Sequence, residues 1–236
     1  MQAVCREAAA RYGWSVDYLP PDSLKRVAFH RPARAVGAPN FYLSAGIHGD
    51  EPAGPLAILR LLEGDRWPDA NFWVVPCLNP TGFLQNTREN GVGIDLNRDF
   101  LSPVSTEVQG QVEWLTSLPH LDLVLLFHED WEANGFYCYE LNGDGRPPLA
   151  ESIIESVSTL CPIEHQNEIE GRTVDRPGII RPGSDPASRP RWPEAIWMAV
   201  HKSKLIYTLE APSDWELPLR VDALVAAARA AFKGWV

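Results

Sequence analysis

"LDLVLLFH", from Leu121 to His128, is the stretch of sequence that decides the fold class. After Asp122 it runs through five apolar residues. It lacks the alternation of apolar and polar side chains that is typical of a strand with one solvent-exposed face. Four further runs are equally short and largely uncharged: Phe41–Ile47, Asn71–Leu78, Phe136–Leu141 and Lys204–Glu210. Strands of this kind are buried on both faces of a sheet, which requires a layer of helices on each side.

Stretches with a helical pattern lie between these runs. They are Gly54–Glu63, Ser105–Leu118, Pro148–Leu160 and Pro218–Trp235. In the last stretch Leu224, Ala228 and Phe232 fall on one face, as in a helix laid on a sheet. The alternation of strands and helices predicts an α/β fold with a mixed, mainly parallel sheet covered by helices on both faces. A chain of 236 residues is long enough for one such domain, so we expect a single domain over residues 1–236.

One segment, from Glu168 to Pro193, does not follow this pattern. It is rich in Pro, Gly, Ser and Arg and shows neither a strand nor a helix period. Long irregular segments inside a compact domain are usually functional or mobile. We therefore expect a functional loop here, ahead of the strand that ends at Glu210.

Composition excludes several classes of protein. The formal net charge is -10 and there is no run of lysines or arginines, which argues against nucleic-acid binding. Arg6, Glu7 and Arg11 interrupt the N-terminal stretch, so we expect neither a signal peptide nor a membrane span, and a cytoplasmic location. The four cysteines lie far apart, which favours reduced, packed thiols over a disulfide framework. The sequence indicates no oligomeric state.

A candidate metal site begins in "AGIHGDEPAG", from Ala45 to Gly54. His48 and Glu51 are three residues apart on a turn that leaves a strand, where an imidazole and a carboxylate can converge on one ion. The same residues also fit a polar turn that begins a helix. A catalytic zinc site needs a third protein ligand. His128 is the candidate, because it ends a buried strand at the sheet edge where α/β proteins bind ligands.

Glu210 ends another predicted buried strand, Lys204–Glu210. A carboxylate in that position is costly to desolvate unless it has a partner or a chemical role. Beside a metal, it is suited to take a proton from water and to give it to a leaving amine. The alternative is a structural glutamate paired with Arg181 or Lys204.

The loop "CLNPTGFLQNTRENGVGIDLNRDF", from Cys77 to Phe100, carries two arginines, Arg88 and Arg98. A guanidinium group can grip a carboxylate with two parallel hydrogen bonds or stabilise an oxyanion. The alternative is a solvated loop in which Arg88 pairs with Glu89, and Arg98 with Asp99.

Taken together, "GIHGDEPAG", "NPTG", "TREN", "GIDLNRDF", the strand ending in His128 and "YTLEAP" resemble the zinc metallocarboxypeptidases of the carboxypeptidase A type, including their small bacterial members. The resemblance runs from about Tyr42 to Pro212. It implies the fold of that family and the following roles in this chain. One Zn²⁺ would be bound by His48, Glu51 and His128; Glu210 would be the general base and acid; Arg88 would stabilise the oxyanion; Asn97 and Arg98 would hold the terminal carboxylate of the substrate; and Asp95 would hydrogen-bond His48.

The chain departs from the digestive members of that family at the pocket. They carry a mobile tyrosine about twenty residues before the catalytic glutamate, whereas this chain has no tyrosine between Tyr139 and Tyr207. The corresponding segment offers Arg189, Arg191, Trp192 and Trp197, which would suit acidic or unusual peptide ends. "EDW" follows His128 in place of small or hydroxyl residues, and the chain is short, as in the compact bacterial type.

The resemblance leaves three functions open. The first is a metallocarboxypeptidase that acts on short peptides, cell-wall peptides included. The second is a zinc-dependent N-acyl amino-acid deacylase of the aspartoacylase and succinylglutamate desuccinylase type. The third is a metal-binding peptide-recognition module without catalysis. The motifs favour the carboxypeptidase, and a small peptide or an acylated amino acid is the expected partner.

Overall fold

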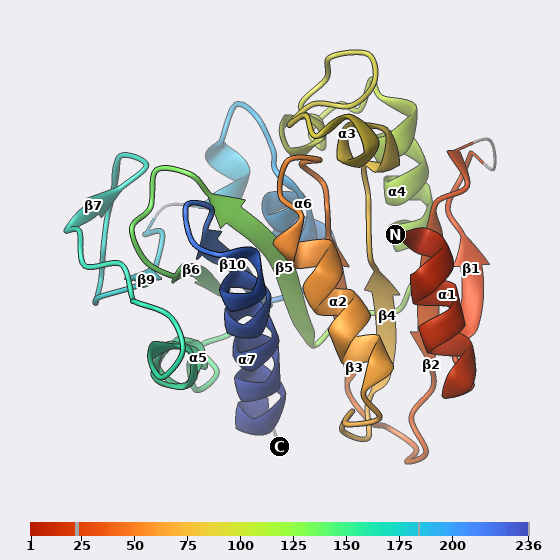
Figure 1. Cartoon of the computed structure of the whole chain (residues 1–236), viewed down its shortest axis with the longest axis horizontal. Coiled ribbons are helices and arrows are strands. Elements are labelled where there is room, and N and C mark those ends of the chain that lie inside the picture. The colour runs from red at the N-terminus through yellow and green to blue at the C-terminus, as the bar shows by residue number, and fades with distance from the viewer. Residues whose placement is uncertain (22–23, 184, 236) are drawn as a thin grey trace.

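The central feature of the computed structural model is an eight-stranded sheet (Figure 1). The structure describes residues 1–21, 24–183 and 185–235. The sheet contains β1 (Ser15–Tyr18), β2 (Val27–Arg31), β3 (Asn40–Ala45), β4 (Asn71–Val75), β5 (Leu123–Asp130), β6 (Tyr137–Asn142), β9 (Ile179–Ile180) and β10 (Leu205–Pro212). Its order is β1-β2-β4-β3-β5-β10-β6-β9, and the four central strands β4, β3, β5 and β10 are parallel. A separate two-stranded ladder pairs β7 (Glu168–Ile169) with β8 (Arg172–Thr173).

Helices cover both faces of the sheet (Figure 1). One face carries α1 (Gln2–Arg11), α2 (Ala53–Glu63), α5 (Ala150–Ser158) and α7 (Leu217–Trp235), whose buried residues share one core cluster. The other face carries α4 (Thr106–Ser117) and α6 (Glu194–His201). The shorter elements are α3 (Pro80–Gln85), η2 (Leu96–Arg98) and η3 (Pro186–Ser188). The predicted α/β class, with a mixed and mainly parallel sheet between two helical layers, is confirmed.

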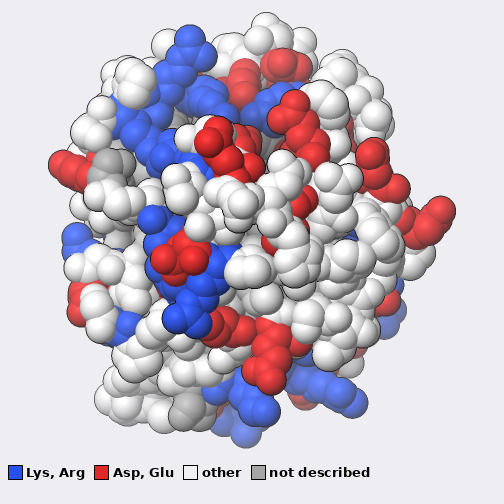
Figure 2. Space-filling view, turned by 90° about the vertical axis from the view of Figure 1, so that its left-hand side faces the viewer, with Lys and Arg blue, Asp and Glu red and all other residues white. Residues whose placement is uncertain are grey.

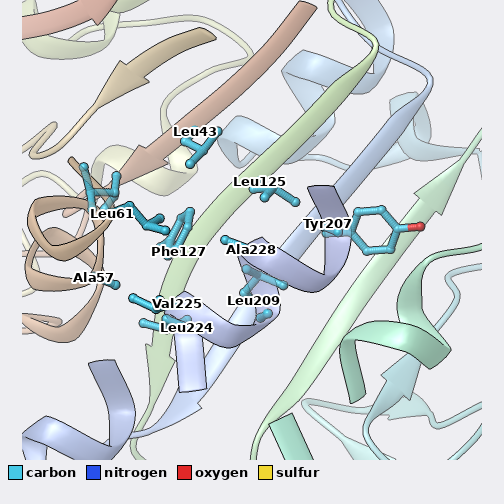
Figure 3. Packing of buried hydrophobic residues seen from close by; sticks show 14 of the residues in the cluster. Leu43, Ala57, Leu61, Leu125, Phe127, Tyr207, Leu209, Leu224, Val225 and Ala228 are labelled. Atoms are coloured by element: carbon cyan, nitrogen blue, oxygen red, sulfur yellow. The ribbon is translucent and has the colours of Figure 1, made fainter. Parts of the chain in front are cut away.

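The two faces of β5 belong to two different hydrophobic clusters. Leu123, Leu125 and Phe127 pack toward α2 and α7, whereas Val124 and Leu126 pack toward α4 and α6. Figure 3 shows the first of these clusters, where Leu125 and Phe127 lie against side chains of α2 and α7. Because successive side chains of a strand point to opposite faces, the next residue on the α4 and α6 side is His128. The direction of successive side chains along β5 therefore places His128, and any site built on it, on the α4 and α6 side of the sheet.

The five predicted strands and four predicted helices are present, with ends that differ by a few residues. The sequence did not predict α1 or the antiparallel edge made by β1 and β2, and the segment Cys77–Phe100, interpreted as a loop, contains α3 and η2. The prediction of a continuous loop over residues 168–193 was wrong in part. That segment contains β7, β8, β9 and η3, and Ile179 of β9 pairs with Cys138 of β6 at the edge of the main sheet. Two-residue strands are too short to produce a visible period.

The four cysteines are free and buried, in agreement with the packing role predicted for them. No helix among the described residues is long and apolar enough to cross a membrane.

An aromatic cluster under α7 gives a test of the core. The ring of Phe72 is fully buried and lies 4.7 Å from Trp67, 5.3 Å from Phe41 and 5.4 Å from Phe232, measured between ring centroids. We expect Phe72→Ala to lower the free energy of unfolding by about 3–5 kcal/mol, because the surrounding rings cannot close the cavity. Urea denaturation measures this change. The exposed Val36→Ala is the control and should stay within about 0.5 kcal/mol of wild type.

Candidate metal centre and active site

The site lies where the carboxyl ends of the parallel strands β3, β5 and β10 meet one edge of the sheet. His48 is placed there by a tight turn after β3. Gly46 has a φ of 64°, in the left-handed region that favours glycine. Gly49 packs so closely on α3 that a Cβ atom would lie 2.0 Å from the backbone of Gly82. The turn therefore depends on these glycines, and it delivers His48 and Glu51 to the edge just before α2 begins.

Three buried side chains converge at this edge. His48, Glu51 and His128 each offer one ligand atom, and these atoms all lie within 4.8 Å of one another. The two oxygens of Glu51 face different imidazoles: Oε1 lies 2.5 Å from Nδ1 of His48, and Oε2 lies 3.0 Å from Nδ1 of His128. The structure thus brings together the three residues that the sequence selected as a metal-binding set.

The electrostatics of this trio favour a cation. Burial lowers the pKa of His48, but the carboxylates of Glu51 and Asp95 raise it to about 9. Burial raises the pKa of Glu51, but the two imidazoles outweigh burial and lower that pKa to about 2. Two imidazole nitrogens and one carboxylate that point at a common centre are a donor set that zinc prefers. The residues therefore fit a divalent metal ion.

Asp95 and Arg88 support the trio from the side. Oδ1 of Asp95 lies 3.4 Å from Nε2 of His48, and its Oδ2 accepts a hydrogen bond of 3.1 Å from Nε of Arg88. Burial raises the pKa of Asp95, but the His48 imidazole and the charges of the nearby arginines bring it below its usual range. A carboxylate in this position orients the ring of a metal-binding histidine. Nη1 of Arg88 lies 3.4 Å from Nδ1 of His48, so the guanidinium borders the metal position.

The alternative pairings within the Cys77–Phe100 loop do not form. Arg88 pairs with Asp95 rather than with Glu89. Asp99 accepts hydrogen bonds from the backbone of Val104 and Ser105 and from Oγ of Ser105, so it stabilises the start of α4. The interpretation of this loop as a set of self-neutralised charges was therefore wrong.

Glu210 faces the same pocket from the adjacent strand. It is the register partner of His128 across the parallel β10–β5 ladder, so both side chains lie on the α4 and α6 side of the sheet. Burial raises the pKa of Glu210 well above its usual value; the charge of His128 opposes this rise, and nearby carboxylates add to it. The structural alternative is wrong for Arg181, which pairs with Glu140 and Glu151 instead.

A cavity of about 490 Å³ joins these groups. It is lined by the three candidate ligands, by Glu210 and Arg88, and by Asn97 and Arg98 of η2. Asn97 is buried, and its Oδ1 accepts a hydrogen bond of 3.0 Å from the backbone N–H of Glu194. Nη1 of Arg98 donates to the carbonyl oxygen of Asn97 at 2.9 Å, while the arginine side chain remains exposed. Asp95 does not line the cavity; it lies behind His48 and Arg88.

The wall of the cavity was predicted only in part. Arg189 and Arg191 line it, as expected, but the tryptophan prediction was wrong. Trp192 and Trp197 pack into the core on the α4 and α6 side, and the tryptophan at the mouth of the cavity is the exposed Trp131.

Several supporting residues were not found from the sequence. Tyr137 and Tyr139 of β6 line the cavity beside Glu210 and Thr208, their register partners on β10. Alternation along β6 would have put both rings on one face, but the strand pairing could not be known. Glu129 accepts a hydrogen bond of 2.6 Å from the backbone N–H of Ala53 and pairs with Arg220, so it fixes the start of α2.

In sequence and fold, the chain is similar to metallopeptidases, to a peptide amidase and to a desuccinylase/aspartoacylase family. Residues 37–139 match the family described as "Succinylglutamate desuccinylase/Aspartoacylase catalytic domain". The chain is 32% identical to murein peptide amidase A of Escherichia coli (strain K12) over 95 residues. The matched stretch covers 40% of this chain and 39% of the amidase. The chain therefore spans well under half the length of that relative.

Solved structures show the same fold over nearly the whole chain. A "putative metallopeptidase" from Shewanella baltica OS155 superposes with a TM-score of 0.85 at 23% identity, over 100% of this chain and 91% of that one. A metallo-carboxypeptidase from Burkholderia cenocepacia superposes with a TM-score of 0.70 at 16% identity, over 99% and 68% of the two chains. The resemblance to the metallocarboxypeptidases predicted from the sequence motifs is confirmed.

Metal content tests the assignment of the ligands. We expect wild-type protein to bind one zinc ion and Glu51→Gln to lose it, because the amide cannot supply the negative charge between the two imidazoles. Equilibrium dialysis followed by elemental analysis measures the stoichiometry. Glu210→Gln is the matched control, a carboxylate of the same cavity that is not among the ligands, and it should keep the ion. Equal zinc content in Glu51→Gln and wild type would show that this trio is not the site.

Proposed function

We propose that the protein is a zinc-dependent hydrolase that cleaves an amide bond next to a residue bearing a terminal carboxylate, as a metallocarboxypeptidase does. The observation that carries this proposal is the meeting of a His-Glu-His trio, a separate carboxylate and a guanidinium at one cavity. The trio can hold a metal ion, Glu210 can move a proton, and Arg88 can bind a developing negative charge. Each group has a different task in amide hydrolysis.

A bound zinc ion would lower the pKa of water and polarise the carbonyl of the scissile amide. Glu210 faces the metal position and accepts the proton that the attacking water loses. Its raised pKa lets it hold that proton and then deliver it to the nitrogen of the leaving amine. The same carboxyl group therefore acts first as a base and then as an acid.

Arg88 is placed to donate hydrogen bonds to the carbonyl oxygen as it becomes negative. Its Nε atom is fixed by Asp95, and its Nη1 atom borders the trio. A donor held in place before the reaction needs no reorganisation when the charge develops. Asp95 therefore links the metal ligand His48 to the oxyanion donor.

Asn97 and Arg98 suit the terminal carboxylate of a substrate. The amide oxygen of Asn97 accepts a hydrogen bond from the backbone N–H of Glu194. The Nδ2 group of Asn97 is therefore the donor that faces a substrate carboxylate in this proposal. Nη1 of Arg98 donates to the carbonyl oxygen of Asn97, and the residue lines the cavity. An amide and a guanidinium side by side can bind both oxygens of a carboxylate.

The family match also supports a second candidate function, an N-acyl amino-acid deacylase of the desuccinylase and aspartoacylase type. That reaction uses the same metal, base and oxyanion donor, and its substrate also carries a carboxylate. We prefer the peptidase because the match to murein peptide amidase A points to short peptides, those of the cell wall included.

A panel of short peptides and N-acyl amino acids, assayed with zinc, separates the peptidase from the deacylase. Release of a C-terminal residue supports the peptidase, and release of an acyl acid alone supports the deacylase.

Glu210→Gln tests the catalytic role and also the alternative of a non-catalytic binding module. We expect kcat to fall by about 10²–10⁴-fold, because the amide cannot accept the proton from water. The assay is peptide hydrolysis at saturating substrate, with metal content measured in parallel. Glu132→Gln, an exposed carboxylate at the mouth of the cavity, is the control and should keep its rate. Full activity in Glu210→Gln would mean that another group is the base.

Arg98→Gln tests recognition of the terminal carboxylate. We expect KM to rise by about 10–100-fold with a smaller change in kcat, because the lost contact is present in both the bound substrate and the transition state. Wild-type enzyme should show a similar loss on peptides whose C-terminus is amidated. If amidated and free peptides were cleaved equally well, this assignment would be wrong.

A further inference from the structure

The cavity has a second basic region, apart from the metal position. Arg172 of β8 and Arg189, which follows η3, both line it, and Arg191 and Arg98 lie at its exposed rim. Figure 2 views the molecule from the side of β7 and β9 and shows Lys and Arg side chains gathered in groups on this face. A chain with a net charge of -10 has acidic side chains in excess, so an arginine-lined wall is a local feature.

These arginines have no ion-pair partner among the described residues. None of the four lies within 4.0 Å of a described carboxylate, and Arg172, Arg189 and Arg191 donate no side-chain hydrogen bond to a described residue. Neighbouring arginines of the same segment behave differently. Arg181 pairs with three carboxylates, and Arg176 lies 3.9 Å from Glu151. Among the described arginines of the segment from Glu168 to Pro193, those that line the cavity are the ones without an ion pair.

Arg172 and Arg189 are also half-buried, so their charges are costly. Burial lowers the pKa of Arg189, and the like charges of Arg172 and Arg98 lower it further. Glu170 does not pair with either group; its carboxylate accepts a hydrogen bond of 2.7 Å from the hydroxyl of Tyr139. Two unpaired cations that share a wall are stabilised when an anion enters the space between them.

The same cavity has an uncharged floor, in which Leu126 and Leu141 are the apolar side chains. Leu126 and Thr208 lie two residues before His128 and Glu210, so they face the same side of the sheet, below the metal position. Leu141 of β6 adjoins them. A floor of this kind accepts a short hydrocarbon chain. A ligand side chain that contacts both the floor and the arginines would therefore have a short aliphatic stem and end in a negative charge.

We propose that Arg172 and Arg189 form a second anion-binding subsite, and that the residue released by the enzyme carries a side-chain carboxylate on a short aliphatic stem. This inference rests on the proposed function, in which Asn97 and Arg98 hold the terminal carboxylate of that residue. The substrate is then a peptide with a dicarboxylic C-terminal residue. Arg172 and Arg189 determine this preference without taking part in the bond-breaking steps.

Matched peptides test the subsite on the zinc-loaded enzyme. The two peptides end in glutamate or glutamine, which have nearly the same shape and differ in charge. We expect kcat/KM to be about 10–100-fold higher for the glutamate peptide, because charge-assisted bonds to arginine are stronger than bonds to an amide. Arg172→Gln and Arg189→Gln should each lower that ratio several-fold. Arg176→Gln, a change of the same kind outside the cavity, should leave it as in wild type. A wild-type ratio near one, or a ratio unchanged by both cavity variants, would overturn the proposal.

Binding separates failure of this inference from failure of the proposed function. Calorimetry with N-acetylglutamate and N-acetylglutamine, on wild-type protein without added zinc, measures the subsite without turnover. Tighter binding of the glutamate compound, lost in Arg189→Gln and kept in Arg176→Gln, supports the subsite even if no peptide is cleaved. Cleavage of both peptides at equal rates, with equal binding of both compounds, would overturn the subsite and leave the hydrolase function standing.

Discussion

The site depends on the register of one parallel strand pair. Glu210 of β10 lies opposite His128 of β5, and side chains at matched positions of neighbouring strands point to the same face. A slip of one residue in either strand would turn one of these groups into the opposite core, among Phe127, Leu209 and the helices α2 and α7. Successive side chains of β5 and β10 pack into two different cores, and this packing opposes that slip. The packing of the two cores therefore also sets the geometry of the candidate base and metal ligand.

Buried charge is the second organising feature, because most of the charged groups at the sheet edge are paired with another group. Glu51 lies between two imidazoles, and Asp95 joins His48 to Arg88. Behind them, Glu129 holds the start of α2 together with Arg220. These pairings offset the free energy of desolvating the groups. Arg172 and Arg189 are half-buried and have no such pairing among the described residues, and for that reason their wall points to a ligand.

Local sequence was informative wherever a side chain is placed by a strand end. The runs ending in His128 and Glu210 are mostly apolar before the last residue, so their position at one edge of a parallel sheet followed from the predicted fold. The turn with His48 and Glu51 was found in the same way. Contacts between distant segments could not be predicted. The pairing of Arg88 with Asp95 instead of Glu89, and of Arg181 with Glu140 instead of Glu210, depends on how the loops are folded against the sheet.

The sequence by itself determined the α/β class, the central strands and the chemical identity of the candidate metal ligands, because strand burial and ligand chemistry are properties of short stretches. Tertiary structure alone decided which residues form the wall of the cavity. Tyr137, Tyr139 and Arg172 reach it through the placement of β6 and the β7–β8 ladder, whereas Trp192 and Trp197 turn into the core. Short irregular segments carry too little period to fix their own direction, so packing against the finished sheet determines where their side chains point.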